Sequence, residues 1–122
     1  IFQIKKRENI ISILRANPKN DYIYIEDVLC CFHKVIQASV ASNLNIYNIS
    51  SGRSYSALEI AKRMCRCAGL SESCIEVKNR LKAEGNLILS NRKAQRELGW
   101  SPEYSLDDGI RDALSKALGA RQ

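Results

Sequence analysis

The order of apolar and polar residues follows two different periods in the first half of the chain. Residues 21–28, DYIYIEDV, begin with alternating aromatic and β-branched side chains, which predicts a strand. Apolar residues then recur every three or four positions to about Ser42, which predicts a helix with Glu26 and Asp27 in its first turn. Residues 45–49, NIYNI, predict a second short strand.

Helix boundaries are marked by capping residues further along the chain. Ser56 and Glu59 have the spacing of a capping box, and Gly69 supplies the stop, so a helix is predicted between them. Residues 74–79, CIEVKN, predict another strand, and residues 9–14, NIISIL, are a candidate for one more.

The C-terminal stretch RELGWSPEYSLDDGI, residues 96–110, predicts two helices joined by a short turn. Gly99 can adopt the left-handed conformation that ends a helix, and Pro102 prevents the helix from continuing. Ser105 has the side chain needed to start the next helix. We expect Trp100 to fold back onto the apolar residues of the first helix.

These elements predict an α/β or α+β fold with short strands alternating with about four helices. The length of 122 residues corresponds to one domain, residues 1–122. No run of about 18 apolar residues occurs, so no membrane-spanning helix is expected. The chain has neither a starting Met nor a signal-peptide pattern, so we expect a cytoplasmic protein cut from a longer polypeptide.

Charge and cysteine content exclude only a few classes of function. The net charge of +6 would suit a polyanion, but the basic residues are dispersed, which argues against nucleic-acid binding. The five cysteines show no C-x-x-C spacing. Cys30 and His33 could share a helix face, but two ligands do not make a zinc site, so no metal is expected. We interpret the cysteines as small buried hydrophobic residues in a reducing cytosol.

The sequence contains no self-sufficient active site. It has no G-x-G-x-x-G or Walker loop for phosphates and no G-x-S-x-G turn for a nucleophile. Its one histidine, His33, is expected at the core or its boundary. The acid pairs Glu26–Asp27 and Asp107–Asp108 open helices, which explains them without acid–base catalysis.

Three stretches together resemble the NAD-dependent nucleotide-sugar epimerases and dehydratases, which are extended short-chain dehydrogenases. DYIYIEDV is similar to their R-D-Y-I-Y-V-x-D-V segment, and NIYNISSG to their x-Y-N-[IL]-G-[ST]-G strand and turn. SNRKAQRELGWSPEYSLDDGIRDAL is similar to their D-x-x-K-A-x-x-E-L-G-W-x-P-x-x-x-L-x-E-G-[IL] ending. The matches occur in the family's order and span residues 21–114.

The resemblance implies the C-terminal, substrate-binding portion of an extended Rossmann-type enzyme, with UDP-glucose 4-epimerase among its types. The N-terminal NAD(P)-binding Rossmann half, with its glycine-rich loop and Tyr-x-x-x-Lys pair, is absent from this chain. We therefore expect no catalytic and no cofactor-binding residues here, and no NAD(P) bound by the chain alone. The implied parent reaction is transient oxidation at the sugar's C4, followed by epimerisation or loss of water.

Three substrate-binding residues follow from the resemblance. Arg80 stands ten residues before Ser90 and matches an arginine that holds the nucleotide diphosphate. Asn20 replaces a second arginine, which in the family contacts the diphosphate or the ribose region. Glu84 can replace an acid that meets a ribose hydroxyl if the alignment shifts by one residue. Without a substrate role, Arg80 is a solvated loop residue and Asn20 a turn residue before a strand.

The implied partners are a nucleotide sugar and the chain's own missing N-terminal half. A separated piece would expose the apolar faces that meet this half, so we expect self-association, and a homodimer is one form it could take. The rival interpretation is a non-catalytic, basic α/β module that binds a polyanion or a protein partner. The sugar, the base, NAD or NADP, and epimerisation or dehydration all remain open.

Overall fold

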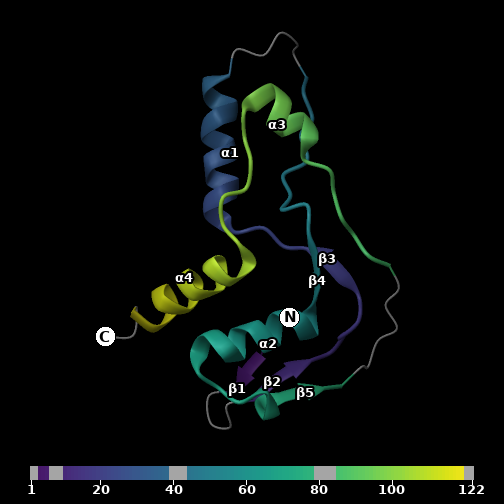
Figure 1. Ribbon diagram of the computed structural model, residues 1–122, viewed down its shortest axis with the longest axis vertical. Coiled ribbons are helices and arrows are strands. Elements are labelled where there is room, and N and C mark those ends of the chain that lie inside the picture. Colours follow the sequence, from purple (N-terminus) through teal and green to yellow (C-terminus); the bar gives the residue numbers. More distant parts are fainter. Residues whose placement is uncertain (1–2, 6–9, 39–43, 79–84, 120–122) are drawn as a thin grey trace.

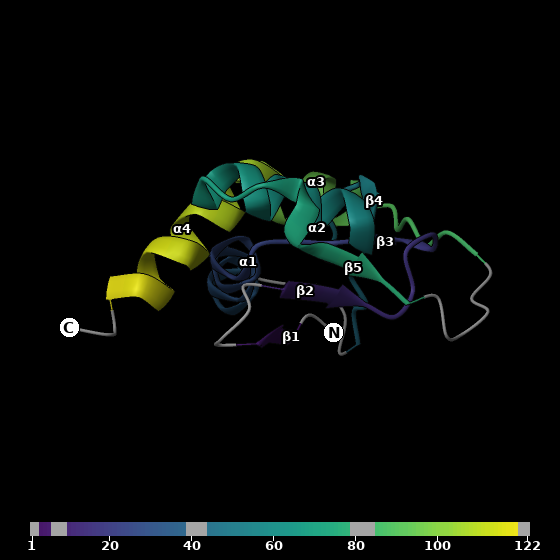
Figure 2. The same ribbon diagram turned by 90° about the horizontal axis from the view of Figure 1, so that it is seen from below.

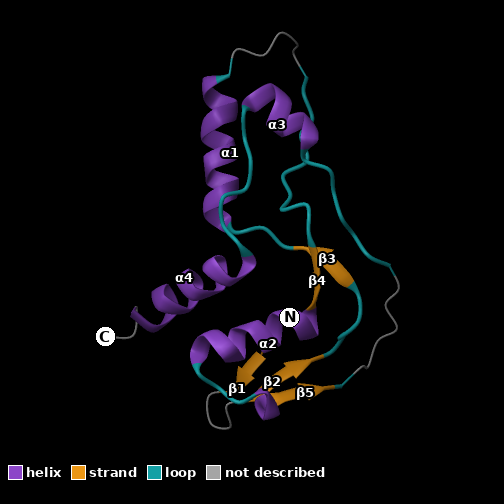
Figure 3. Cartoon of the chain, in the orientation of Figure 1, coloured by secondary structure: helices purple, strands orange, loops and turns teal. Residues whose placement is uncertain are grey.

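Short strands and four helices make up the described part of the chain. The computed structural model describes residues 3–5, 10–38, 44–78 and 85–119. In chain order the elements are β1 (Gln3–Lys5), β2 (Ile10–Ile13), β3 (Lys19–Asp21), α1 (Ile25–Gln37), β4 (Ser54–Ser56), α2 (Ala57–Ala68), the 3-10 turn η1 (Glu72–Cys74), β5 (Ile75–Val77), α3 (Arg92–Leu98) and α4 (Leu106–Gly119). Helices α1 and α3 lie side by side at one end, and β1, β2, β5 and α2 form the other (Figures 1 and 3). The predicted α/β class is confirmed.

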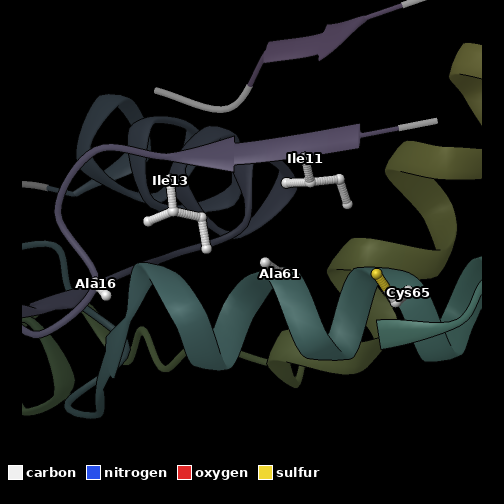
Figure 4. Close-up of a cluster of buried hydrophobic side chains, with 5 residues drawn as sticks. All are labelled: Ile11, Ile13, Ala16, Ala61 and Cys65. Carbon is white, nitrogen blue, oxygen red and sulfur yellow. The ribbon is translucent and has the colours of Figure 1, made fainter. Parts of the chain in front are cut away.

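A three-stranded sheet with α2 against one face forms the first core. Its order is β1-β2-β5, with β2 antiparallel to β1 and parallel to β5. Helix α2 lies over the sheet in the view of Figure 2. Ile11 and Ile13 point to the same side of β2, because side chains alternate along a strand, and they meet Ala61 and Cys65 of α2 (Figure 4). The small side chains of α2 let the helix approach the sheet closely, and the core here is compact rather than large.

A second core lies between α1 and α3. Cys31 of α1 packs with Ala94, Leu98 and Trp100, and Trp100 is fully buried. Helix α3 ends because Gly99 has a φ of 58°, in the left-handed region. The chain then turns back, so the predicted packing of Trp100 onto the preceding helix is confirmed.

The predicted start and stop of α2 are also confirmed. Ser56 accepts a hydrogen bond from the backbone N–H of Glu59, and the Glu59 carboxylate accepts one from the backbone N–H of Ser56. Gly69 ends the helix with a φ of 66°. Two reciprocal bonds thus satisfy amide donors that a helix N-terminus otherwise leaves open.

Two predicted strands differ from the structure. The strand expected from residue 21 ends at Asp21, because its partner β4 is only three residues long and the chain turns at Gly52 just before it. Residues 45–49 run outside both sheets among the described residues, since an extended segment becomes a strand only beside a partner. The predicted end of α1 near Ser42 is also wrong, because the helix stops at Gln37.

Candidate functional site

Strand β3 and the segment that follows residue 84 lie side by side. The backbone N–H of Lys19 donates to Asn86 Oδ1 at 3.2 Å, and the N–H of Leu87 donates to the Lys19 carbonyl at 2.9 Å. Residues 85–87 therefore pass along the strand that carries Asn20. This contact brings together two regions that are more than sixty residues apart in the sequence.

The described chain that ends at Lys78 is held at β2. The backbone N–H of Lys78 donates to the Ile13 carbonyl at 2.8 Å, which continues the parallel pairing of β2 with β5. Lys78, which precedes residues 79–84, thus lies beside the end of β2, and Asn86, which follows them, lies beside β3. Arg80 and Glu84, two of the predicted substrate-binding residues, lie in this stretch and outside the described residues.

Asn20, the third predicted residue, is exposed in the middle of β3 and stands opposite Tyr55 in the register. Its neighbours on the strand are fixed by polar contacts. Lys19 Nζ lies 3.3 Å from Glu59 Oε1. The Asp21 carboxylate accepts bonds from the backbone N–H groups of Ser51 and Gly52, at 2.8 and 3.0 Å. These contacts hold both sides of Asn20.

A cleft of about 650 Å³ opens between α2 and α4. Its size suits a small-molecule ligand. Aromatic rings form much of its wall, and aliphatic side chains of both helices complete it; the tyrosines are Tyr22, Tyr24, Tyr55 and Tyr104. Arg53 and Ser51 contribute the polar groups on the side of the turn after residue 50. No local signal in the sequence predicts the cleft.

Tyr24 is held in a charged network that links α1 to α4. Its hydroxyl donates to the Asp112 carboxylate, and Lys116 Nζ lies 2.8 Å from Asp112 and 3.1 Å from Glu26. The hydrogen bond to Asp112 is the main cause that raises the pKa of Tyr24. A tyrosine that acts as a base needs a lowered pKa, so this network ties helices together rather than preparing catalysis.

Neither a glycine-rich phosphate cradle nor a cluster of metal ligands occurs among the described residues. Glycines with positive φ occur singly, and two of them, Gly69 and Gly99, end helices instead of cradling a phosphate at a helix start. Across the described ranges, no group of three or more His, Cys, Asp or Glu side chains is placed to hold a metal ion.

His33 is exposed on α1, so its expected place at the core or its boundary is wrong. None of the described helices is long and apolar enough to cross a membrane.

Comparisons with known proteins identify relatives along most of the chain. A sequence model described as GDP-mannose 4,6 dehydratase matches residues 1–113. The UDP-glucose 4-epimerase of Corynebacterium glutamicum is 34% identical over 105 residues, covering 83% of this chain and 32% of that protein. The dTDP-4-dehydro-6-deoxyglucose reductase of Escherichia coli is 32% identical over 101 residues, covering 82% of this chain and 31% of that protein.

A solved structure matches the fold as well. The crystal structure of UDP-glucose 4-epimerase from Bifidobacterium longum, in complex with NAD+ and UDP, aligns with a TM-score of 0.79 and 24% sequence identity. The alignment covers 90% of this chain and 35% of that one. The chain therefore spans about a third of the length of the relatives it matches.

Proposed function

This chain belongs to the GDP-mannose 4,6 dehydratase family of NAD-dependent nucleotide-sugar epimerases and dehydratases, and from that premise we propose that it forms the nucleotide-sugar-binding part of such an enzyme. The single observation that carries the proposal is that the described residues on either side of positions 79–84 are hydrogen-bonded to neighbouring strands, Lys78 to the end of β2 and Asn86 and Leu87 to Lys19 of β3. The chain that follows Arg80 and Glu84 in sequence is thus tied to the strand with Asn20, which supports a shared site.

Charge at these flanks favours an anionic ligand. Arg15 is exposed in the connection between β2 and β3, and Lys19 and Lys78 stand at the two anchor points. Both lysines already have carboxylate partners, Glu59 and Glu76. We therefore assign the diphosphate to Arg80, because a guanidinium can hold two phosphate oxygens at once.

Replacing Arg80 tests this assignment. In the polypeptide that contains the complete family fold, Arg80→Ala should raise the Kd for a UDP- or GDP-sugar at least about tenfold, since a hydrogen bond to a charged group contributes about 1.5–3 kcal/mol. Titration calorimetry gives the Kd directly. Arg66→Ala, at an exposed arginine of α2, is the matched control for loss of one positive charge. An unchanged Kd in the Arg80 variant would remove Arg80 from the site.

Salt and base dependence distinguish this function from binding of a general polyanion. A nucleotide-sugar site should prefer one nucleobase among UDP-, GDP- and dTDP-sugars at any one salt concentration. A polyanion-binding module should instead show no base preference and lose affinity steeply as salt rises.

We further propose that the remaining two thirds of the family fold bind NAD(P) and supply the catalytic tyrosine. The surface suited to them is the outer side of α1, where Ile25, Leu29, Phe32 and Ile36 are 52–83% exposed at spacings of four, three and four residues. This spacing is a continuous stripe on one helix face, which we call the α1 stripe. Large exposed apolar stripes on a small domain indicate an interface.

The proposed location is the cytoplasm, and a homodimer of the whole enzyme is compatible with this assignment.

Two observations test the proposal that substrate binding and catalysis reside in different parts of the enzyme. The 122 residues alone should show no epimerase or dehydratase turnover with added NAD or NADP, and detectable turnover would overturn it. The coding sequence upstream of Ile1 should contain a glycine-rich βαβ unit and a Tyr-x-x-x-Lys pair. If that sequence instead encodes an unrelated domain, the non-catalytic interpretation takes its place.

A further inference from the structure

Two cysteines that are nine residues apart in the sequence come into contact in the fold. Cys65 Sγ, on the last turn of α2, lies 3.3 Å from Cys74 Sγ, where η1 meets β5. A disulfide bond is about 2.05 Å long, so the two sulfur atoms need to approach by only about 1.2 Å. Both cysteines are free thiols in the structure.

We propose that Cys65 and Cys74 form an oxidation site, at which a hydroperoxide converts the two thiols into a disulfide linking α2 to β5. This goes beyond the proposed function, because it involves neither the nucleotide sugar nor NAD(P). Sequence spacing gave no sign of it, since the contact depends on how α2 and β5 pack around the first core.

Burial assigns the two cysteines different roles. Cys65 is fully buried among Ile11, Ile13 and Ala61 (Figure 4), whereas Cys74 is half-buried at the edge of the same core. A peroxide therefore reaches Cys74 first. Burial and the hydrogen bond with Cys74 raise the pKa of Cys65 to about 11, so Cys65 is in the less nucleophilic of its two forms, the thiol, near neutral pH.

The reaction takes place in two balanced steps. The Cys74 sulfur attacks the O–O bond of the hydroperoxide and becomes a sulfenic acid, and the other oxygen leaves as an alcohol or water. Cys65 then attacks the sulfenic sulfur, its proton leaves with the hydroxyl group as water, and the S–S bond forms. The two thiols lose two electrons and the peroxide gains them. Exchange with a cellular thiol regenerates the reduced pair.

The cross-link would anchor β5, the strand that comes just before residues 79–84 in the sequence. Cys74 immediately precedes β5, which ends at Val77, three residues before Arg80. A disulfide also lowers the entropy of the unfolded chain by closing a loop. Oxidation should therefore raise the unfolding temperature of the chain.

Peptide mapping after hydrogen peroxide treatment tests the site. The full chain is oxidised in buffer and in concentrated guanidinium chloride, remaining thiols are alkylated, and disulfide-linked peptides are measured by mass spectrometry. In the native chain, Cys65–Cys74 should make up most of the disulfide. In guanidinium, the ten pairs that five cysteines allow compete by loop length, which favours Cys67–Cys74 over Cys65–Cys74, so the ratio of Cys65–Cys74 to Cys67–Cys74 should fall several-fold.

Serine variants provide the controls. Cys74→Ser should abolish the peroxide-induced rise in unfolding temperature, and Cys67→Ser, at a half-buried cysteine two residues from Cys65 on α2, should leave the rise intact. Equal pair distributions in buffer and guanidinium would overturn the proposal. Persistence of Cys65 as a free thiol after complete oxidation of Cys74 would overturn it as well.

Discussion

At the scale of single residues, Asp27 shows how one side chain organises the joint between α3 and α4. It is 3% exposed, and its carboxylate accepts hydrogen bonds from the backbone N–H groups of Glu103 and Tyr104 at 2.8 and 3.3 Å. Its carbonyl accepts a bond from Trp100 Nε1 at 2.9 Å. The sequence predicted Asp27 as a helix-capping acid, but its carboxylate binds a loop more than seventy residues away instead.

Removing this carboxylate should destabilise the fold. Asp27→Ala leaves two part-buried amide donors without their acceptors, and we expect a loss of about 1–2 kcal/mol in the free energy of unfolding. Asp27→Asn retains one acceptor oxygen and should lose less. Urea denaturation followed by Trp100 fluorescence measures both, and Glu26→Ala, at the neighbouring half-buried acid, is the control. Equal losses in Asp27→Ala and Glu26→Ala would contradict this role.

Glu59 should make stability depend on pH in the acid range. Its hydrogen bond with the Ser56 backbone is the main cause that lowers its pKa from the ordinary value of 4.5. A pKa that is lower in the folded state gives stability that is complete above pH 4.5 and is lost as the pH falls through the folded-state pKa. Glu59→Gln should therefore cost no more than about 1 kcal/mol near neutral pH, since the group is partly exposed. A difference from the parent chain that persists unchanged in strong acid would exclude this linkage.

At the scale of elements, the sequence correctly predicted the features that depend on contacts between neighbouring residues, such as the ends of helices. The capping box at Ser56 and the glycine stops at Gly69 and Gly99 could be found because their hydrogen bonds join residues within one turn. The strand expected at residues 45–49 depended on a neighbour that the sequence pattern cannot name. The same limit applies to the site: the residue identities suggested Asn20, Arg80 and Glu84, but the flanking contacts at β2 and β3 are known only from the fold.

The sequence pattern also gave no indication that α4 packs on Tyr24. Gly109 is buried in α4, and a Cβ at this position would lie 2.9 Å from Tyr24 Cδ2 and 3.0 Å from Cγ. Glycine-to-alanine exchange inside a helix normally stabilises by about 1 kcal/mol. Gly109→Ala should nevertheless lower the free energy of unfolding, because overpacking costs about 1–3 kcal/mol. Thermal unfolding measures the change, and Ser115→Ala, exposed on the same helix, should be neutral or stabilising. A more stable Gly109→Ala chain would contradict this prediction, because it would show that Tyr24 moves away from α4 without a measurable cost in free energy.

At the scale of the whole molecule, the two small cores and the cleft leave the fold with much apolar surface in contact with solvent. The first core lies under α2 and the second between α1 and α3. Charged contacts such as Arg63–Asp107 at 2.8 Å and the Lys116 network join α4 to α2 and α1. Partly or fully exposed ion pairs such as these add little stability. Burial of further apolar surface would therefore stabilise the chain more than additional ion pairs.

The α1 stripe should therefore drive association of the isolated chain. We expect concentration-dependent oligomers in sedimentation velocity, and Phe32→Gln combined with Ile36→Lys should reduce them strongly. These side chains are 62% and 83% exposed, so the double variant removes little packing and should unfold at nearly the same temperature. Leu70→Gln, at a residue 42% exposed beyond the end of α2, is the control and should leave association unchanged. A parent chain that is a cooperatively unfolding monomer at all concentrations would contradict this interface. If the double variant in turn fails to join a separately expressed N-terminal half that the parent chain joins, the same stripe serves both contacts.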